Sequence, residues 1–252
     1  MEFAPYIYVL ALLAGVLAGI INTLAGSGSL ITLPVLIFLG LPANVANGTN
    51  RVAILFQTII GVQQLKRGGY LPLAGSKWVI IATTLGAILG ALVAVELDAE
   101  AMELAIIIVM IVMFFVILVR PQRWLREEPE LVEGRPRIHI LLLFFGVGLY
   151  GGFIQAGVGV LLLAALVLGA GHTLLTGNAI KLVVTLIYTI FILGIFIYAG
   201  QVYWAYGLLM AAGQGAGAFL GARFAMKVPG ANVWVRRLLI VVVLGSIIKL
   251  LI

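Results

Sequence analysis

Two cationic residues stand at matching places in two apolar halves of this chain. Arg51 follows Asn-Gly-Thr-Asn at 47–50, and Lys181 follows Thr-Gly-Asn-Ala-Ile at 176–180. Each is expected in the first turn or two of a long apolar segment. A cation inside hydrocarbon is costly, so it usually faces a partner or a water-filled cavity. At a helix N-terminus it also opposes the helix dipole. Two such costs at related positions predict a centre that holds an anion.

Two glycine-rich turns supply further donors for an anion. The sequence Gly-Ser-Gly-Ser at 26–29 separates two apolar segments, and Gly-Val-Gly at 157–159 matches it in the second half. Glycine lets backbone N–H groups point at a ligand, serine hydroxyls add donors, and a following helix N-terminus adds positive potential. The planar fork of Arg51 suits the oxygens of sulfonate, sulfite or carboxylate. The predicted substrate-binding residues are Gly26, Ser27, Gly28, Ser29, Thr49, Asn50, Arg51, Gly157, Gly159, Asn178 and Lys181.

The same residues also have structural interpretations, which the sequence leaves open. Gly26 and Gly28 can serve close helix packing, and Ser29 can cap a helix. Arg51 can extend its side chain to the membrane interface, and Lys181 aligns with it only after an offset of one residue. Other polar residues in apolar segments can line the pathway or bond between helices; these are Asn22, Gln57, Gln155 and Gln214.

The composition identifies the class of protein that must position these residues. Of 252 residues, 63% are hydrophobic and 10% are charged, whereas soluble domains are about half apolar and about a quarter charged. The chain is therefore a polytopic membrane protein. Its basic residues cluster in short loops, which indicates membrane topology and argues against nucleic-acid binding.

Missing residue types exclude several functions. The chain has no Cys, so disulfides and thiolate metal sites are excluded. No Asp or Glu falls inside a predicted segment, since Glu96 and Glu103 stand at segment ends, which makes a carboxylate proton relay or metal cage unexpected. Without a Walker sequence, the chain cannot bind ATP in that way. We expect no cofactor and no metal.

A polar linker divides the chain into two halves with five apolar segments each. We assign residues 1–119 to a first repeat, 120–137 to a cytoplasmic linker and 138–252 to a second repeat. The predicted segments are 5–24, 29–41, 48–65, 76–96, 101–119, 138–155, 158–170, 176–199, 203–226 and 235–252.

The two halves resemble each other in sequence and differ in predicted orientation. Gly-Ala-Ile-Leu-Gly-Ala at 86–91 matches Gly-Ala-Phe-Leu-Gly-Ala at 217–222, a spacing of glycines typical of close helix packing. Placing the basic connections at 66–77, 120–137 and 227–237 in the cytoplasm puts both termini outside. The repeats are then inverted, and inverted repeats are typical of transporters with a substrate site near the midplane.

The second and seventh segments are too short to cross a bilayer. About 13 residues span roughly 20 Å at about 1.5 Å per residue, against a hydrocarbon core of about 30 Å. Turns at 26–29 with 44–50, and at 157–159 with 171–178, should therefore lie within the membrane, in protein or beside water. We expect them to converge on one site. The predicted fold is an all-α polytopic membrane protein with about 8–10 transmembrane segments. Each inverted repeat combines three spanning helices with a helix–turn–short-helix unit.

Taken in this order, these motifs resemble the TauE/SafE family of sulfite and sulfonate exporters, also called the toluene sulfonate uptake permease family. The resemblance covers nearly the whole chain. It implies an integral membrane carrier of organosulfur or other small anions. One departure concerns the first turn, where the family commonly has a run of glycines and this chain has Ser27 and Ser29. The motifs that carry the resemblance are Gly26–Ser29, Pro34, Leu39–Pro42, Ala46–Arg51, Lys66–Tyr70 and Gly157–Gly159.

The expected function is export of small anions such as sulfite or organosulfonates, by alternating access around a cationic site between the repeats. The expected partners are the anion and the lipid bilayer, and a homo-oligomer is left open. On this hypothesis Arg51→Ala abolishes transport with folding near normal. Alternatives are an anion channel, or a membrane scaffold or accessory subunit. An intramembrane enzyme is disfavoured, because the chain has only two His and no carboxylate inside a segment.

Overall fold

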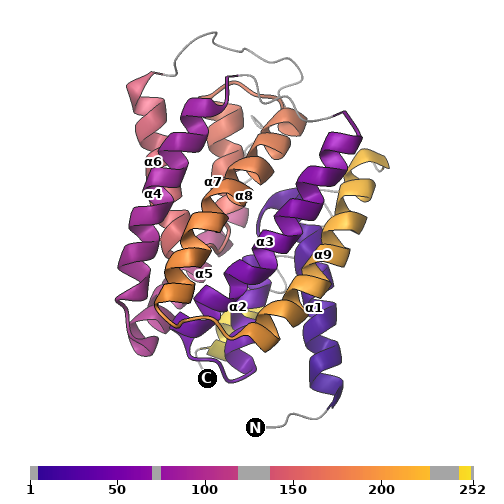
Figure 1. The fold of residues 1–252 in the computed structure, drawn as a ribbon, viewed down its shortest axis with the longest axis vertical. Coiled ribbons are helices and arrows are strands. Elements are labelled where there is room, and N and C mark those ends of the chain that lie inside the picture. The colour runs from indigo at the N-terminus through magenta and orange to yellow at the C-terminus, as the bar shows by residue number, and fades with distance from the viewer. Residues whose placement is uncertain (1–4, 70–74, 119–136, 228–243, 251–252) are drawn as a thin grey trace.

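A computed structural model describes residues 5–69, 75–118, 137–227 and 244–250, and the regular structure in these ranges is entirely helical. Figure 1 shows the helices packed side by side as one bundle. Residues 244–250 are also helical. The helices of the first half are α1 (Pro5–Ala25), α2 (Ser29–Phe38), α3 (Ala43–Arg67), α4 (Lys77–Val95) and α5 (Ala99–Leu118). Those of the second half are α6 (Ile138–Phe153), α7 (Val158–Ala164), the π-helical η2 (Ala165–Gly169), α8 (Leu174–Tyr198) and α9 (Trp204–Lys227).

Several of these helices suit a lipid environment. Within the described ranges, three are long and apolar enough to cross a membrane by length and composition, and they belong to α4, α5 and α8. The turn-forming units are shorter: α2 has 10 residues, and α7 has 7 residues and continues into the 5 residues of η2. At about 1.5 Å per residue, neither unit is long enough to cross the hydrocarbon core.

Corresponding helices of the two halves run in opposite directions. In Figure 1, α1, α3 and α9 run upward, whereas α4, α6 and α8 run downward. The start of α1 and residues 244–250 lie at the lower end. Basic residues mark the upper end, because Lys66 and Arg67 end α3, Lys77 begins α4 and Arg137 precedes α6. Acidic residues such as Asp98 fall at the lower connection between α4 and α5.

The halves exchange partners when they pack. Helix α1 lies along α9, and α4 lies along α6, so the first helix of each half pairs with the fourth helix of the other. Glycine permits both approaches: a Cβ on Gly217 would meet the Val16 carbonyl, and one on Gly86 would meet the Phe145 carbonyl. The interpretation of these glycines as helix-packing positions is confirmed.

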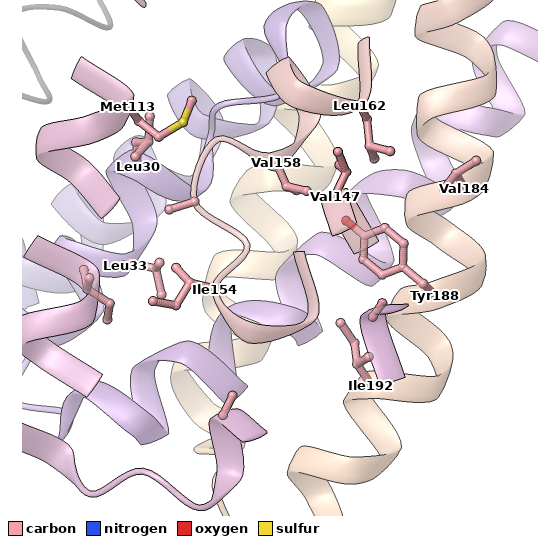
Figure 2. Close-up of a cluster of buried hydrophobic side chains, with 14 of the residues drawn as sticks. Leu30, Leu33, Met113, Val147, Ile154, Val158, Leu162, Val184, Tyr188 and Ile192 are labelled. Carbon is pink, nitrogen blue, oxygen red and sulfur yellow. The ribbon is translucent and has the colours of Figure 1, made fainter. Parts of the chain in front are cut away.

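An apolar core surrounds the second turn. Figure 2 shows Ile154 and Val158, which flank this turn, among side chains from α2, α5, α6 and α8. Ile154 is 0% exposed and Val158 3%. Burial of this kind stabilises the turn through the hydrophobic effect. The other labelled members of the cluster are Leu30, Leu33, Met113, Val147, Leu162, Val184, Tyr188 and Ile192.

Two of the four predicted turns are wrong in extent. Helix α3 begins at Ala43 rather than at residue 48, directly after Pro42, so residues 44–50 are helical. Their polar side chains have tertiary partners, and the helix need not end to satisfy them. Helix α8 begins at Leu174, with the Thr173 side chain accepting from the Thr176 N–H at 3.2 Å. The predicted turn at 171–178 thus ends at 173, and both cations lie in the third helical turn.

Candidate functional site

The two glycine-rich turns touch each other where the halves meet. The Gly159 N–H donates to the Gly26 carbonyl at 3.1 Å. A Cβ on either residue would overlap the backbone of the other. Both turns also use a left-handed glycine, Gly26 with φ 75° and Gly157 with φ 72°, a conformation that L side chains rarely adopt. The starts of α2 and α7 are therefore held together by backbone alone.

Arg51 is fully buried and reaches the C-terminal turn of α6. Its Nη1 donates to the Gly151 carbonyl at 2.7 Å and to Gln155 Oε1 at 2.5 Å. Its Nη2 donates to the Gly152 carbonyl at 2.9 Å and to Asn47 Oδ1 at 3.1 Å, with a longer contact to the next carbonyl of α6. These carbonyls carry the negative end of the α6 dipole, so the guanidinium caps that helix favourably.

The neighbours of Arg51 are fixed in turn. Gln155 Nε2 donates to the Tyr188 hydroxyl at 3.2 Å, and Asn47 Nδ2 donates to the Phe153 carbonyl at 2.8 Å. The Phe196 ring centroid lies 5.3 Å from the Arg51 guanidinium carbon, within the range of a cation–π contact. Nearly every donor of Arg51 is thus occupied by neutral protein groups.

Lys181 makes the equivalent contact in the other direction. Its Nζ donates to the Asn22 carbonyl at 3.3 Å, in the last turn of α1, and the residue is 1% exposed. In each half, a cation on α3 or α8 therefore bonds the C-terminal turn of the other half's first helix. The acidic residues in the described ranges lie at the α4–α5 connection and in the first turns of α5; they are Glu96, Asp98, Glu100 and Glu103.

Asn22 joins Lys181 to the first turn and to α3. Its Nδ2 donates to Gln57 Oε1 at 2.6 Å, and its Oδ1 accepts from the Gly28 N–H at 3.3 Å. Gln57 Nε2 and Ser27 Oγ are buried here with no hydrogen-bond partner among the described residues. Polar atoms of this kind are rare in native structures and call for an explanation.

Of the remaining predicted site residues, some have polar atoms that bond other elements of the fold, and one has a polar atom without a partner among the described residues. Asn50 links α3 to α2, because its Nδ2 donates to Ser29 Oγ at 3.1 Å and its Oδ1 accepts from Thr32 Oγ1 at 2.7 Å. Thr49 Oγ1 accepts from the Tyr203 N–H at 2.9 Å, at the α8–α9 connection and not at the turns. The Asn178 Oδ1 atom has no partner in the described part of the chain.

Asn22, Gln57 and Gln155 were not among the predicted substrate-binding residues, and Tyr188 was not identified from the sequence. All four are hydrogen-bonded to one another or to the two cations. The sequence feature that could have identified them is a polar or hydroxyl group inside an otherwise apolar segment. Gln57 follows Arg51 on α3 and Tyr188 follows Lys181 on α8 at nearly the same spacing.

Comparisons with known proteins find relatives described as membrane transporters. The chain is 28% identical to a probable membrane transporter protein, ORF9, of Sinorhizobium sp, over 99% of this chain and 94% of the relative. It is 28% identical to a probable membrane transporter protein of Haemophilus influenzae, over 84% and 82%. It is 29% identical to the probable membrane transporter protein YfcA of Escherichia coli K12, over 89% and 82%. No solved structure matches the chain.

The family indicates transport rather than catalysis. The model of the family described as sulfite exporter TauE/SafE matches residues 11–250, which is nearly the whole sequence. The chain is therefore a membrane transporter of the TauE/SafE family.

Proposed function

We propose that this transporter exports small oxyanions such as sulfite or organosulfonates, by alternating access around a site between two inverted repeats. The main support is the pair of buried cations, Arg51 and Lys181, which flank the contact between the two turns with no carboxylate beside them in the described ranges. Buried ionisable groups in membrane segments commonly mark substrate pathways. Two further contacts support a shared site: Gly26 and Gly159 meet at the turns, and Asn22, whose carbonyl accepts from Lys181, also accepts from the Gly28 N–H.

The inverted repeats are supported by direction and by packing. We assign the first repeat to residues 1–119 and the second to 138–252, joined by a cytoplasmic linker at 120–137. The opposed directions of α1 and α6, α3 and α8, and α4 and α9 fit a two-fold axis in the membrane plane. The exchanged pairs α1–α9 and α4–α6 follow from the same axis.

The orientation follows from charge. The end of the bundle that carries Lys66, Arg67, Lys77 and Arg137 is proposed to face the cytoplasm, which puts the start of α1 outside. An inside-negative potential then favours outward movement of anions by about 2.3 kcal/mol per charge per 100 mV. Export therefore needs no coupling ion.

The function is tested with purified protein in liposomes. Vesicles are loaded with sulfite, methanesulfonate, thiosulfate or acetate, and efflux is followed with and without an imposed potential. A carrier gives saturable efflux that is accelerated by the same anion on the opposite side. Efflux no faster than from protein-free vesicles for every anion contradicts the proposal, and non-saturating flux without counter-exchange identifies a channel instead.

A further inference from the structure

We propose that the two cations have different roles: the anion binds at Lys181, Gln57 and Ser27 on the α1 side of the turn contact, whereas Arg51 is a structural helix cap. This inference rests on the proposed anion transport and assigns the binding site to one side of the turn contact. Three differences between the two sides carry it.

The first difference is the donor capacity that each cation retains. The two terminal nitrogens of Arg51 make five contacts with carbonyl or amide oxygens, and only Nε lacks a partner among the described residues. An ammonium has three donors, and the structure gives Lys181 one acceptor, the Asn22 carbonyl at 3.3 Å. Lys181 can therefore bond an anion without releasing a protein partner.

The second difference is the polar atoms beside each cation. Asn22 is hydrogen-bonded to Lys181, to Gln57 and to the Gly28 N–H, so it connects the ammonium to Gln57 and to the turn that contains Ser27. Gln57 Nε2 and Ser27 Oγ have no partner among the described residues. Gln57 and Ser27 are both 0% exposed. On the Arg51 side, the amide of Gln155 is used at both ends, by Arg51 and by Tyr188. Beside Lys181, two neutral donors therefore lack a partner, whereas on the other side the unpartnered donor is Nε of Arg51 itself.

The third difference is in the turns themselves. Ser27 follows the left-handed glycine of the first turn, and Val158 follows that of the second. Val158 packs in the apolar core beside Leu162 (Figure 2), and its side chain offers no donor. A hydroxyl is therefore present at this position only on the side of Lys181.

These donors define a ligand class. One ammonium, one amide N–H₂ and one hydroxyl suit a singly charged oxyanion with several oxygens, such as a sulfonate or hydrogensulfite. A dianion would keep one uncompensated charge in a site of low dielectric, which is strongly unfavourable. Sulfate, which has a similar set of oxygens and a second charge, should therefore compete poorly.

The test uses the full chain in liposomes with methanesulfonate as the probe. Lys181→Met removes the charge and keeps the length of the side chain. Because a charge-assisted hydrogen bond is lost, we expect flux at low substrate to fall by at least about tenfold. We also expect methanesulfonate to raise the melting temperature of the wild type and to leave that of Lys181→Met unchanged. Lys181→Arg should retain part of the flux and part of the rise in melting temperature.

Ser27→Ala keeps the test informative if Lys181→Met fails to fold. Ser27 Oγ has no partner among the described residues, so its removal breaks no protein hydrogen bond there. We expect an unchanged melting temperature without ligand and a half-saturating methanesulfonate concentration raised about fivefold, the lower range for one hydrogen bond. An unchanged half-saturating concentration in Ser27→Ala overturns the assignment.

The outcomes separate this inference from the proposed function. If the wild type moves methanesulfonate and folded Lys181→Met moves it equally well, the inference is wrong and the function stands. If the wild type moves neither methanesulfonate nor sulfite, the proposed function fails. Sulfate that competes as well as methanesulfonate contradicts the singly charged class.

Discussion

A buried cation in a membrane protein can be stabilised by a helix end as well as by an anion. Arg51 illustrates this, because its guanidinium meets successive carbonyls at the end of α6. These carbonyls have no helical partner of their own, since the helix stops at Phe153. The arrangement stabilises both the charge and the helix terminus in a region without bulk water.

Replacement of Arg51 by Met should therefore destabilise the fold. Several buried acceptors lose their donor at once, and each costs about 1–3 kcal/mol when left unsatisfied. We expect a loss of at least about 3 kcal/mol, seen as a lower midpoint of unfolding in detergent. Arg51→Lys should be intermediate, because it keeps the charge and loses the fork.

This expectation replaces the one drawn from the sequence, in which Arg51→Ala removed transport with folding near normal. The two are distinguishable. A variant with the wild-type unfolding midpoint and no anion flux would return Arg51 to the substrate site. The role of Arg51 in substrate binding stays a prediction until then.

At the scale of elements, the contact between the turns depends on the absence of side chains. A Cβ on Gly159 would overlap backbone atoms of Gly26 rather than a movable side chain. We expect Gly159→Ala to separate α2 from α7, lower the unfolding midpoint and abolish flux. Gly194→Ala on α8 is the matched control, because its Cβ would meet nothing within 4 Å.

The control should be neutral or slightly stabilising, since Ala in a helix interior is favoured over Gly by up to about 1 kcal/mol. Equal midpoints and equal flux for the two variants would mean that the turns do not need their close approach.

Most helices could be predicted because long apolar runs end at charges, prolines or glycines. The predicted segments 5–24 and 138–155 differ from α1 and α6 by one or two residues at an end. The start of α3 could not be predicted, because Asn47 and Asn50 are typical of turns when considered alone. Their partners, Phe153 and Ser29, are remote in sequence, and only the folded chain shows that they are satisfied.

The candidate site was predictable in kind and less so in detail. The Arg–Lys pair and the two turns stood out because cations and glycine-rich breaks are unusual in apolar segments. The sequence could not predict that the donors of Arg51 bond the carbonyls of α6, since every helix end offers similar carbonyls. Thr49 was assigned to the site, yet it bonds the α8–α9 connection.

At the scale of the molecule, the proposed inverted arrangement makes a direct labelling prediction. Arg67 ends α3 and Tyr198 ends α8, and both are exposed. The chain has no Cys, so single cysteines can be introduced without background. In intact cells, a membrane-impermeant maleimide should label Tyr198→Cys, and should label Arg67→Cys only after permeabilisation.

Glu100→Cys, at the start of α5, is the control for the outer side and should behave as Tyr198→Cys does. Repeats that face the same way would place Arg67 and Tyr198 on one side, so identical labelling of the two positions contradicts the proposed topology. Labelling of Arg67→Cys in intact cells, with Tyr198→Cys labelled only after permeabilisation, would support inverted repeats in the opposite membrane orientation.

The pairing of α1 with α9 has a consequence for biogenesis. Residues of α1, such as Val16, leave the ribosome well before the glycines of α9 against which they pack, such as Gly217. During synthesis, the face of α1 that packs on α9 is therefore exposed to lipid until α9 is made. Helix α4 can pack on α6 earlier. Packing of α1 in this protein therefore waits for the synthesis of α9. A truncation that removes α9 should leave α1 an unassembled, protease-sensitive span even though every residue of α1 is intact.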